Sequence, residues 1–219
     1  MTTEIRIDRL ADLTRAHAEV RPNAVALVYQ DRETTFAELD RRASQVANGL
    51  IAAGLKPQTR VAYLDKNSDR LFEVLFGAAK ANDVLVAVNW RLAPPEAAYV
   101  INDALAEVLF VGKEFFPVVE QVLPDLKTVR KVIALDDPRE GWELYDDWRA
   151  GQSADDPRIP IEGSDVAIQM YTSGTTGHPK GAQLTNDNFF TLLPTATREW
   201  GNQWTPDDVN LVCMPLFHI

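Results

Sequence analysis

The run VLVAV at residues 84–88 is apolar at every position, and it lies between two further apolar-rich runs, RVAYL at 60–64 and EVLFV at 107–111. A strand that is apolar on both faces needs cover on both faces, which is typical of parallel sheets in α/β proteins. The segments between these runs show helical spacing of apolar residues, and a fourth strand is predicted at 129–135. This alternation predicts an α/β fold with a mixed, largely parallel β-sheet and helices on both faces.

Periodicity and turn signals predict the remaining elements outward from these strands. Gly54 suits the position just after a helix, because glycine accepts the left-handed conformation found there. Helices are predicted at 8–20, 36–50, 68–79, 94–103 and 113–123, with a short one between Trp142 and Trp148 and another after residue 186, and strands are predicted at 24–29, 34–36, 166–172 and 209–214.

Single residues predict where three of the helices begin. Asp8 and Ser68 are expected to cap the helices that follow them, because their side-chain oxygens accept hydrogen bonds from free backbone N–H groups. Asn186 or Asp187 is expected to cap the last helix, which Pro194 should kink or interrupt because proline has no N–H donor.

The composition describes a folded and acidic protein. Its 219 residues suffice for one large domain or two small ones, and a hydrophobic content of 46% supports a sizeable core. The formal net charge of −10 argues against a nucleic-acid partner, whose binding depends on Lys and Arg. Residues 136–165 alone carry ten acidic residues and three arginines, which predicts an acidic excursion on the surface.

Cys213 is the single cysteine, so the chain cannot form an internal disulfide, which fits a reducing cytoplasm. It lies in an apolar run at 209–215 and is expected to be a buried small hydrophobe rather than a nucleophile. The first ten residues, MTTEIRIDRL, do not resemble a signal peptide, and no apolar run approaches transmembrane length. Peripheral contact with a membrane remains open.

The chemistry is concentrated in the stretch YTSGTTGHPKG at residues 171–181. Glycine lets successive backbone N–H groups turn toward one point and form a nest for an anion, while hydroxyls add donors and a lysine adds a positive charge. This combination suits a polyphosphate. The residues expected to hold it are Thr172, Ser173, Gly174, Thr175, Thr176, Gly177 and Lys180.

This stretch differs from the two common glycine-rich nucleotide loops. Pro179 precedes Lys180 and Gly181 follows it, so the pattern is neither a Walker A motif nor the dinucleotide fingerprint. A polar Gly/Ser/Thr linker is the alternative, but a linker would not follow an apolar run such as residues 166–171, which predicts a buried strand. Some of the hydroxyls could instead bond only to neighbouring backbone.

The stretch resembles the phosphate-binding signature of the acyl-adenylate-forming superfamily of AMP-binding enzymes, which includes acyl-CoA synthetases, luciferases and the adenylation domains of peptide synthetases. Residues 34–50, 78–104 and 214–219 resemble other motifs of the same family. One departure is Asn82-Asp83, which replaces the usual Ala-Gly pair. The pairs Arg91-Leu92 and Phe217-His218 are more similar to acyl-CoA synthetases than to peptide-synthetase domains.

The resemblance implies part of the large N-terminal domain of the adenylate-forming fold. Residues 1–135 would form its α/β region, 136–165 the acidic surface excursion and 166–219 the phosphate-loop region. The Gly-x-Thr-Glu motif, the ribose-binding aspartate, the hinge and the late catalytic lysine of the family are not found in these 219 residues. We therefore expect an N-terminal portion of a longer enzyme, inactive alone and prone to self-association through uncovered apolar surface.

The implied activity is that of an acid–thiol ligase that uses ATP, Mg²⁺ and coenzyme A. A carboxylic acid, expected to be a fatty or aryl acid, becomes acyl-AMP and is then transferred to the thiol. By resemblance, Lys180 and His218 are the catalytic candidates, His218 lines the carboxylate site, and Thr172 offers a hydroxyl to Mg²⁺. His17 and His178 are read as bystanders. An adenylation domain that loads a carrier protein and a non-catalytic nucleotide-binding module remain as alternatives.

Overall fold

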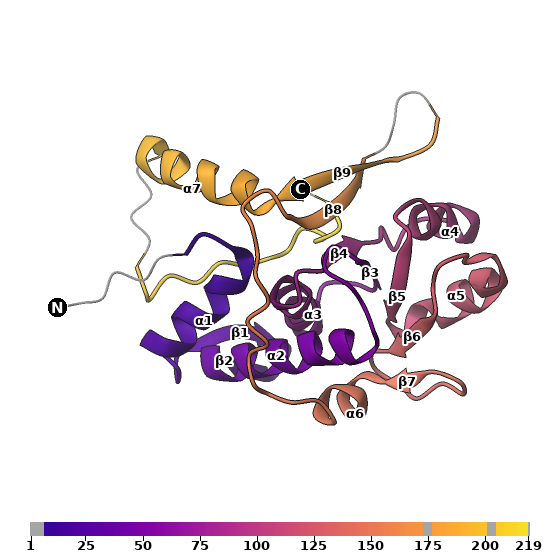
Figure 1. Ribbon diagram of the computed structural model, residues 1–219, viewed down its shortest axis with the longest axis horizontal. Coiled ribbons are helices and arrows are strands. Elements are labelled where there is room, and N and C mark those ends of the chain that lie inside the picture. Colours follow the sequence, from indigo (N-terminus) through magenta and orange to yellow (C-terminus); the bar gives the residue numbers. More distant parts are fainter. Residues whose placement is uncertain (1–6, 173–176, 201–204, 219) are drawn as a thin grey trace.

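The computed structural model describes residues 7–172, 177–200 and 205–218, the last helix without the side chains of Pro194 and residues 196–200 (Figure 1). In this part of the chain a seven-stranded sheet has the order β7-β6-β5-β3-β4-β8-β9, and β9 runs antiparallel to β8 while the other pairs are parallel. A separate antiparallel pair is formed by β1 and β2. The strands are β1 (Val25–Tyr29), β2 (Arg32–Thr35), β3 (Arg60–Leu64), β4 (Val84–Ala87), β5 (Ala106–Val111), β6 (Lys131–Ala134), β7 (Glu143–Leu144), β8 (Val166–Thr172) and β9 (Lys180–Thr185).

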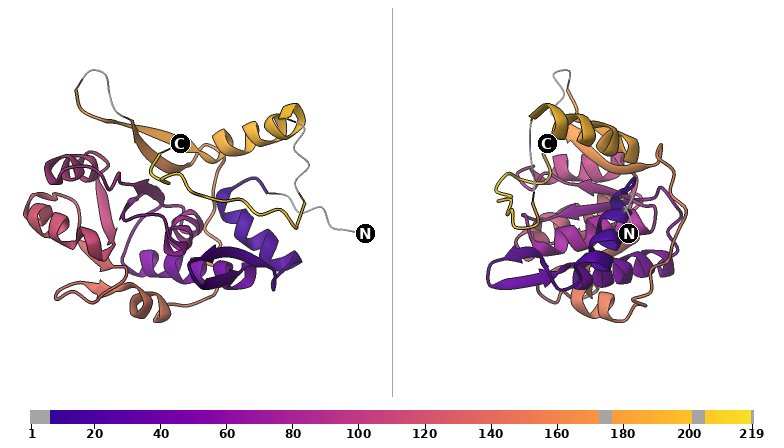
Figure 2. Two further views of the ribbon diagram at one scale, coloured as in Figure 1. Left: turned by 180° about the vertical axis from the view of Figure 1, so that it is seen from behind. Right: turned by 90° about the vertical axis from the view of Figure 1, so that its left-hand side faces the viewer.

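Helices cover both faces of the large sheet, as the apolar strands predict (Figures 1 and 2). The α-helices are α1 (Leu10–Val20), α2 (Phe36–Ala52), α3 (Asp69–Lys80), α4 (Pro94–Asp103), α5 (Phe116–Val122), α6 (Tyr145–Ala150) and α7 (Asn186–Trp200), and the short 3₁₀ helices are η1 (Lys113–Phe115) and η2 (Leu123–Asp125). The predicted α/β architecture is therefore confirmed.

Alternate residues of β3 enter two separate cores. Ala62 and Leu64 pack with residues of α4 and α5 on one face, whereas Val61 and Tyr63 pack with residues of α2, α3 and α6 on the other. All four side chains are at most 2% exposed. The chain moves from β3 to β4 through α3, and then back across β3 to β5 and β6 through α4 and α5, which explains the helices on opposite faces.

The end of α2 confirms the role predicted for Gly54. Its φ of 82° is left-handed, and its N–H donates to the carbonyl of Ile51 at 2.8 Å. The next N–H, that of Leu55, donates to the carbonyl of Leu50 at 3.2 Å. These two bonds form a Schellman motif, which satisfies carbonyls that the helix itself leaves free.

Two expected helix caps are made differently. The N-cap of α1 is Arg9 rather than Asp8, and the Asp12 carboxylate accepts a hydrogen bond from the Arg9 N–H at 3.0 Å. Ser68 occupies the N-cap position of α3, but its hydroxyl shares a 2.9 Å hydrogen bond with the hydroxyl of Tyr63 and does not cap. The preference of a residue type for the N-cap position therefore does not determine which group its side chain binds.

The helix α7 also begins differently from the prediction. It starts at Asn186, and the capping contacts come from Thr185, whose hydroxyl accepts from the N–H of Asn188 at 3.3 Å. The Asn186 side chain is buried and accepts instead from the N–H of Leu10, at 3.0 Å. The helix continues through Pro194, so the expected interruption is not observed.

The segment expected as an acidic excursion is partly built into the core, which corrects that prediction. Residues 143–144 pair with β6 as the edge strand β7. Tyr145 is fully buried and Trp148 is 6% exposed, and both pack against Phe110 of β5. The segment packs against the core despite its surrounding charges, because each of these aromatic rings buries a large apolar area.

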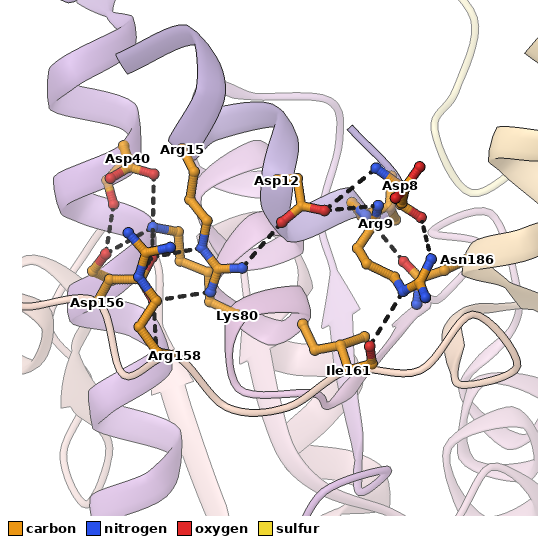
Figure 3. Close-up of polar contacts among 12 residues, drawn as sticks. Asp8, Arg9, Asp12, Arg15, Asp40, Lys80, Asp156, Arg158, Ile161 and Asn186 are labelled. Atoms are coloured by element: carbon orange, nitrogen blue, oxygen red, sulfur yellow. Dashed lines mark hydrogen bonds and ion pairs between the residues drawn. The ribbon is translucent and has the colours of Figure 1, made fainter. Parts of the chain in front are cut away.

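Residues 151–165, called the strap below, connect α6 to β8 across the surface of α1, α2 and α3. Its Asp156 carboxylate accepts two hydrogen bonds from the guanidinium of Arg15, at 2.6 and 2.9 Å (Figure 3). The same carboxylate accepts from the buried ammonium of Lys80, which also contacts Asp40 at 2.6 Å and Ser44 at 2.9 Å. The strap thus joins three helices through one ion-pair network.

The predicted strand at 209–214 is wrong, because residues 205–218 contain no strand in the structure. Val209 and Leu211 are 93% and 83% exposed, and Cys213 is exposed rather than buried. A strand needs a partner for its backbone, and the structure shows this segment tethered instead by the side-chain amide of Asn67, at 2.7 Å from the Met214 carbonyl. Among the described residues no helix is long and apolar enough to cross a membrane.

Candidate functional site

The hairpin formed by β8 and β9 carries the predicted phosphate loop. β8 pairs with β4 only at Ile168 and Gln169, so residues 170–172 have β9 as their only strand neighbour in the described structure. The hairpin consequently projects beyond the sheet, with the loop at its tip (Figures 1 and 2).

The base of the loop is defined by Thr172 and Lys180, which face each other in the last strand pair. Gly177 has a φ of 123°, a conformation that a side chain would strain, so the sequence-based reason for a glycine holds at this position. The remaining loop candidates, Ser173, Gly174, Thr175 and Thr176, lie outside the described residues.

Lys180 has the properties expected of an anion ligand. Its side chain is exposed, and its ammonium has no ion pair or hydrogen bond with any described residue. Thr172, directly opposite, is also exposed. A cation without an internal partner has no carboxylate to displace before it binds a phosphate. The phosphate role of these residues remains a prediction.

The described residues contain no cluster of three or more His, Cys, Asp or Glu side chains that could hold a metal ion. Thr172 supplies a single hydroxyl at the end of β8. Because Mg²⁺ keeps several waters and binds through substrate phosphates, one protein hydroxyl beside a triphosphate is compatible with its chemistry.

Gly181 has a steric role in the hairpin. Its backbone does not adopt a positive φ. A Cβ atom added there would lie 2.5 Å from Nε2 of Gln169 and 3.1 Å from Cζ of Tyr171. The missing side chain therefore makes room for two residues of the neighbouring strand.

Those two residues connect the hairpin to α4. The Gln169 amide donates to the hydroxyl of Tyr171 at 3.0 Å, and this hydroxyl donates to the Asp103 carboxylate at 2.7 Å. Burial and the adjacent Asp103 carboxylate raise the pKa of Tyr171, so the phenol stays protonated and remains a donor.

A second contact from α4 holds the other side of the loop. The ring of Tyr99 stacks on that of His178, with centroids 4.6 Å apart and planes at 21°. The Tyr99 hydroxyl also donates to the carbonyl of Pro179 at 3.4 Å. His178 therefore makes a ring contact with α4 although its side chain is exposed. Sequence reasoning missed Tyr99, Asp103 and Gln169 as site residues, because no local spacing signals a contact between distant segments.

His218, the second catalytic candidate, is exposed, and its backbone N–H donates to the Pro215 carbonyl at 3.0 Å. Its neighbour Phe217 packs edge-on against Trp90, with ring centroids 6.1 Å apart. Trp90 follows β4, and β4 and β8 are parallel neighbours. The structure therefore brings His218 to the same edge of the sheet as the loop, without a direct contact to Lys180 among the described interactions.

The chain matches known proteins along nearly its whole length. Residues 14–219 match the family described as AMP-binding enzyme. The chain is 37% identical, over 98% of its length, to the fatty acid–[acyl-carrier-protein] ligase ScoC of Streptomyces coeruleorubidus, and it covers 40% of that protein. It therefore spans about two fifths of the length of this curated relative.

Two solved structures share the fold. The anthranilate CoA ligase AuaEII in complex with anthranoyl-AMP superposes with a TM-score of 0.81 at 30% identity, over 91% of this chain and 38% of that one. ATP-bound MatB from Rhodopseudomonas palustris superposes with a TM-score of 0.82 at 27% identity, over 97% of this chain and 41% of that one. The mixed, mostly parallel sheet is thus the architecture of adenylate-forming enzymes.

Proposed function

The chain belongs to the AMP-binding enzyme family of adenylate-forming acyl-CoA and acyl-carrier-protein ligases, and we propose that the protein containing it activates a carboxylic acid with ATP. The carboxylate attacks the α-phosphate, which gives acyl-AMP and releases pyrophosphate. Coenzyme A then displaces AMP, and the product is an acyl thioester. The proposed acid is a fatty or aryl acid, since ScoC and AuaEII are named for substrates of these two kinds.

The observation that carries this proposal is the ammonium of Lys180, which has no partner among the described residues and lies at the base of a projecting hairpin, opposite Thr172. Negative charge builds up on the leaving pyrophosphate during the first step, and a cation and N–H groups placed there stabilise it. We assign Lys180, Thr172 and Gly177 to the β- and γ-phosphates, together with Ser173, Gly174, Thr175 and Thr176 of the same motif.

Two further roles complete the proposal. The Thr172 hydroxyl would be a ligand of the Mg²⁺ that accompanies ATP, and the ion would neutralise phosphate charge. His218 would lie at the carboxylate site, held in place by the packing of Phe217 on Trp90. The single cysteine supports a reducing compartment as the place of the reaction.

The test is carboxylate-dependent exchange of pyrophosphate into ATP, measured on the natural protein that carries these residues. Lys180→Ala is expected to lower the exchange rate about 10²-fold, and Lys180→Arg should lose less because it keeps the charge. The matched control is Lys127→Ala, since Lys127 is also exposed but lies far along the chain from the hairpin. Undiminished exchange in Lys180→Ala would refute the phosphate role of the loop.

A carrier protein is the second candidate acceptor, and the similarity to ScoC favours it. The two acceptors share the adenylation step and differ only in the thiol, which both present on a phosphopantetheine arm. Supplying coenzyme A and a phosphopantetheinylated carrier protein in parallel, and measuring acyl transfer to each, separates them. Nucleotide binding without exchange for any acid would instead indicate a non-catalytic module.

A further inference from the structure

The helix α4 contacts the hairpin where the sheet no longer supports it. Beyond Gln169, no residue of β8 is paired with β4 in the described structure. At this point Asp103 binds Tyr171 on β8, and Tyr99 binds Pro179 just before β9. Tyr99 and Asp103 are four residues apart, so they share one face of α4.

A directed chain of hydrogen bonds runs through this contact. The Arg60 guanidinium donates to Gln169 at 3.3 Å, Gln169 donates to Tyr171 at 3.0 Å, and Tyr171 donates to Asp103 at 2.7 Å. The chain starts at a cation and ends at an anion, so each bond polarises the next in the same sense. Such a network fixes both the position and the direction of the Tyr171 side chain.

The motif itself is arranged around this network. Gly181, next to Lys180, leaves the space that Gln169 and Tyr171 occupy, because a Cβ there would collide with both. Each anchored residue is also adjacent to a proposed phosphate ligand, since Tyr171 precedes Thr172 and Pro179 precedes Lys180. Movement at either anchor would therefore move one ligand relative to the other.

We propose that Asp103 and Tyr99 are positioning residues for the phosphate-binding hairpin. They hold its two strands so that the Lys180 ammonium and the Thr172 hydroxyl face a polyphosphate together. The hairpin is then ordered when the protein folds, so ligand binding does not have to order it at a further cost in conformational entropy. This inference rests on the proposed function of the loop, but it concerns residues outside the loop and makes its own prediction.

The test uses the 219-residue chain, with inorganic tripolyphosphate and Mg²⁺ as the probe and calorimetry as the measurement. Asp103→Asn and Tyr171→Phe are each expected to raise the dissociation constant about 3- to 10-fold, because Tyr171→Phe removes the hydrogen bond and Asp103→Asn replaces a charge-assisted bond with a weaker neutral one. Asp103→Ala should raise it more than Asp103→Asn, whose amide oxygen can still accept from Tyr171. The control is Asp125→Asn, which makes the same change on an exposed aspartate without a contact to the hairpin.

A second measurement does not depend on ligand binding. Hydrogen exchange of the backbone amides at 170–172 and 180–182 should be at least about tenfold faster in Asp103→Asn than in the wild type, while the sheet amides of β3 and β5 stay unchanged. A spectroscopic titration should also show a lower pKa for the Tyr171 phenol in this variant, because the adjacent carboxylate charge is lost.

The outcomes separate the two proposals. One outcome is that Lys180→Ala loses tripolyphosphate binding, whereas Asp103→Asn and Tyr171→Phe bind it and exchange their backbone amides as the wild type does. This outcome overturns the positioning role and leaves the proposed function of the loop standing. Absence of binding in the wild-type chain counts against the loop function. In that case unchanged amide exchange in Asp103→Asn still overturns the positioning role.

Discussion

The ammonium of Lys80 lies 3.0 Å from the Asp156 carboxylate, and the lysine side chain is fully buried at the end of α3. Asp40 and Ser44 of α2 accept its other two hydrogen bonds, so all three donors of the ammonium are satisfied. A buried charge is tolerated when it is paired and bonded in this way. The pair fastens the strap to the helices that cover one face of the sheet (Figure 3).

Lys80→Met is expected to destabilise the fold by about 3 kcal/mol, because it leaves two carboxylates without their buried partner. Urea unfolding followed by circular dichroism measures this change. The control is Lys66→Met, which removes an ion pair with Glu114 whose two side chains are 50% and 57% exposed, and which should cost at most about 1 kcal/mol. Equal effects of the two substitutions would contradict the role of the buried pair.

The burial of Asp83 predicts that the stability of the fold falls as the pH rises from about 4 to about 8. Asp83 is 2% exposed, and burial raises its pKa to about 8, although the backbone N–H of Thr59 opposes this shift. The folded state therefore prefers the protonated form, while the unfolded state ionises near the ordinary value of 3.8. The stabilising contribution is fully present below about pH 4 and is lost progressively as the pH rises to about 8.

Asp83→Asn should remove this dependence, because its amide does not ionise. We expect the free energy of unfolding of the variant to decline less steeply than that of the wild type between pH 5 and 8. The two declines should differ by a few kcal/mol over this range, and urea unfolding at several pH values measures them. Asp125→Asn, on the surface, should leave the slope unchanged. Parallel pH profiles of Asp83→Asn and the wild type would show that Asp83 does not hold its proton.

Gly181→Ala is expected to destabilise the hairpin by about 1–3 kcal/mol, because the new methyl group overlaps Gln169 and Tyr171. Gly151→Ala is a suitable control, since the nearest atom to its added Cβ is the Asp147 carbonyl oxygen at 3.5 Å, an ordinary contact. Thermal unfolding compares the two variants. If Gly181→Ala melts at as high a temperature as the control, the packing of Gln169 and Tyr171 against Gly181 is not tight.

The exposed apolar segment at 205–214 predicts self-association of this chain. Val209, Leu211 and Met214 are 93%, 83% and 66% exposed, and uncovered apolar residues in one stretch favour contact with another molecule. Sedimentation velocity should show oligomers or aggregates at micromolar concentration, and Val209→Asp with Leu211→Asp should shift the chain toward the monomer. A monomeric wild-type chain at all concentrations would contradict this expectation.

Local signals predict the centre of the fold well. β3 at 60–64, α4 at 94–103 and β8 at 166–172 have the bounds that apolar runs and paired prolines indicate. These elements have strong local signals, because a fully apolar run favours a buried strand and the prolines Pro94 and Pro95 suit the first turn of a helix, where no N–H donor is needed.

The failures outside the helix caps share one physical cause, which is dependence on a distant partner. Tyr145 and Trp148 are buried because Phe110 is beside them, although the surrounding sequence is acidic. Residues 209–214 have the composition of a strand, but a strand forms only where another strand accepts its hydrogen bonds. The contacts of Tyr99 and Asp103 with the hairpin could not be predicted from the sequence for the same reason.

The strap has a consequence for the order of assembly. Leu85 of β4 pairs with Ile168 of β8, and the strap is the last segment made before β8. During synthesis β3, β4, β5 and β6 can therefore join while one side of β4 is still an open edge, and such an edge is liable to pair with a foreign strand. The docking of Asp156 onto Lys80 brings β8 toward that edge, so the ion pair would shorten the interval in which a nascent chain is vulnerable to aggregation.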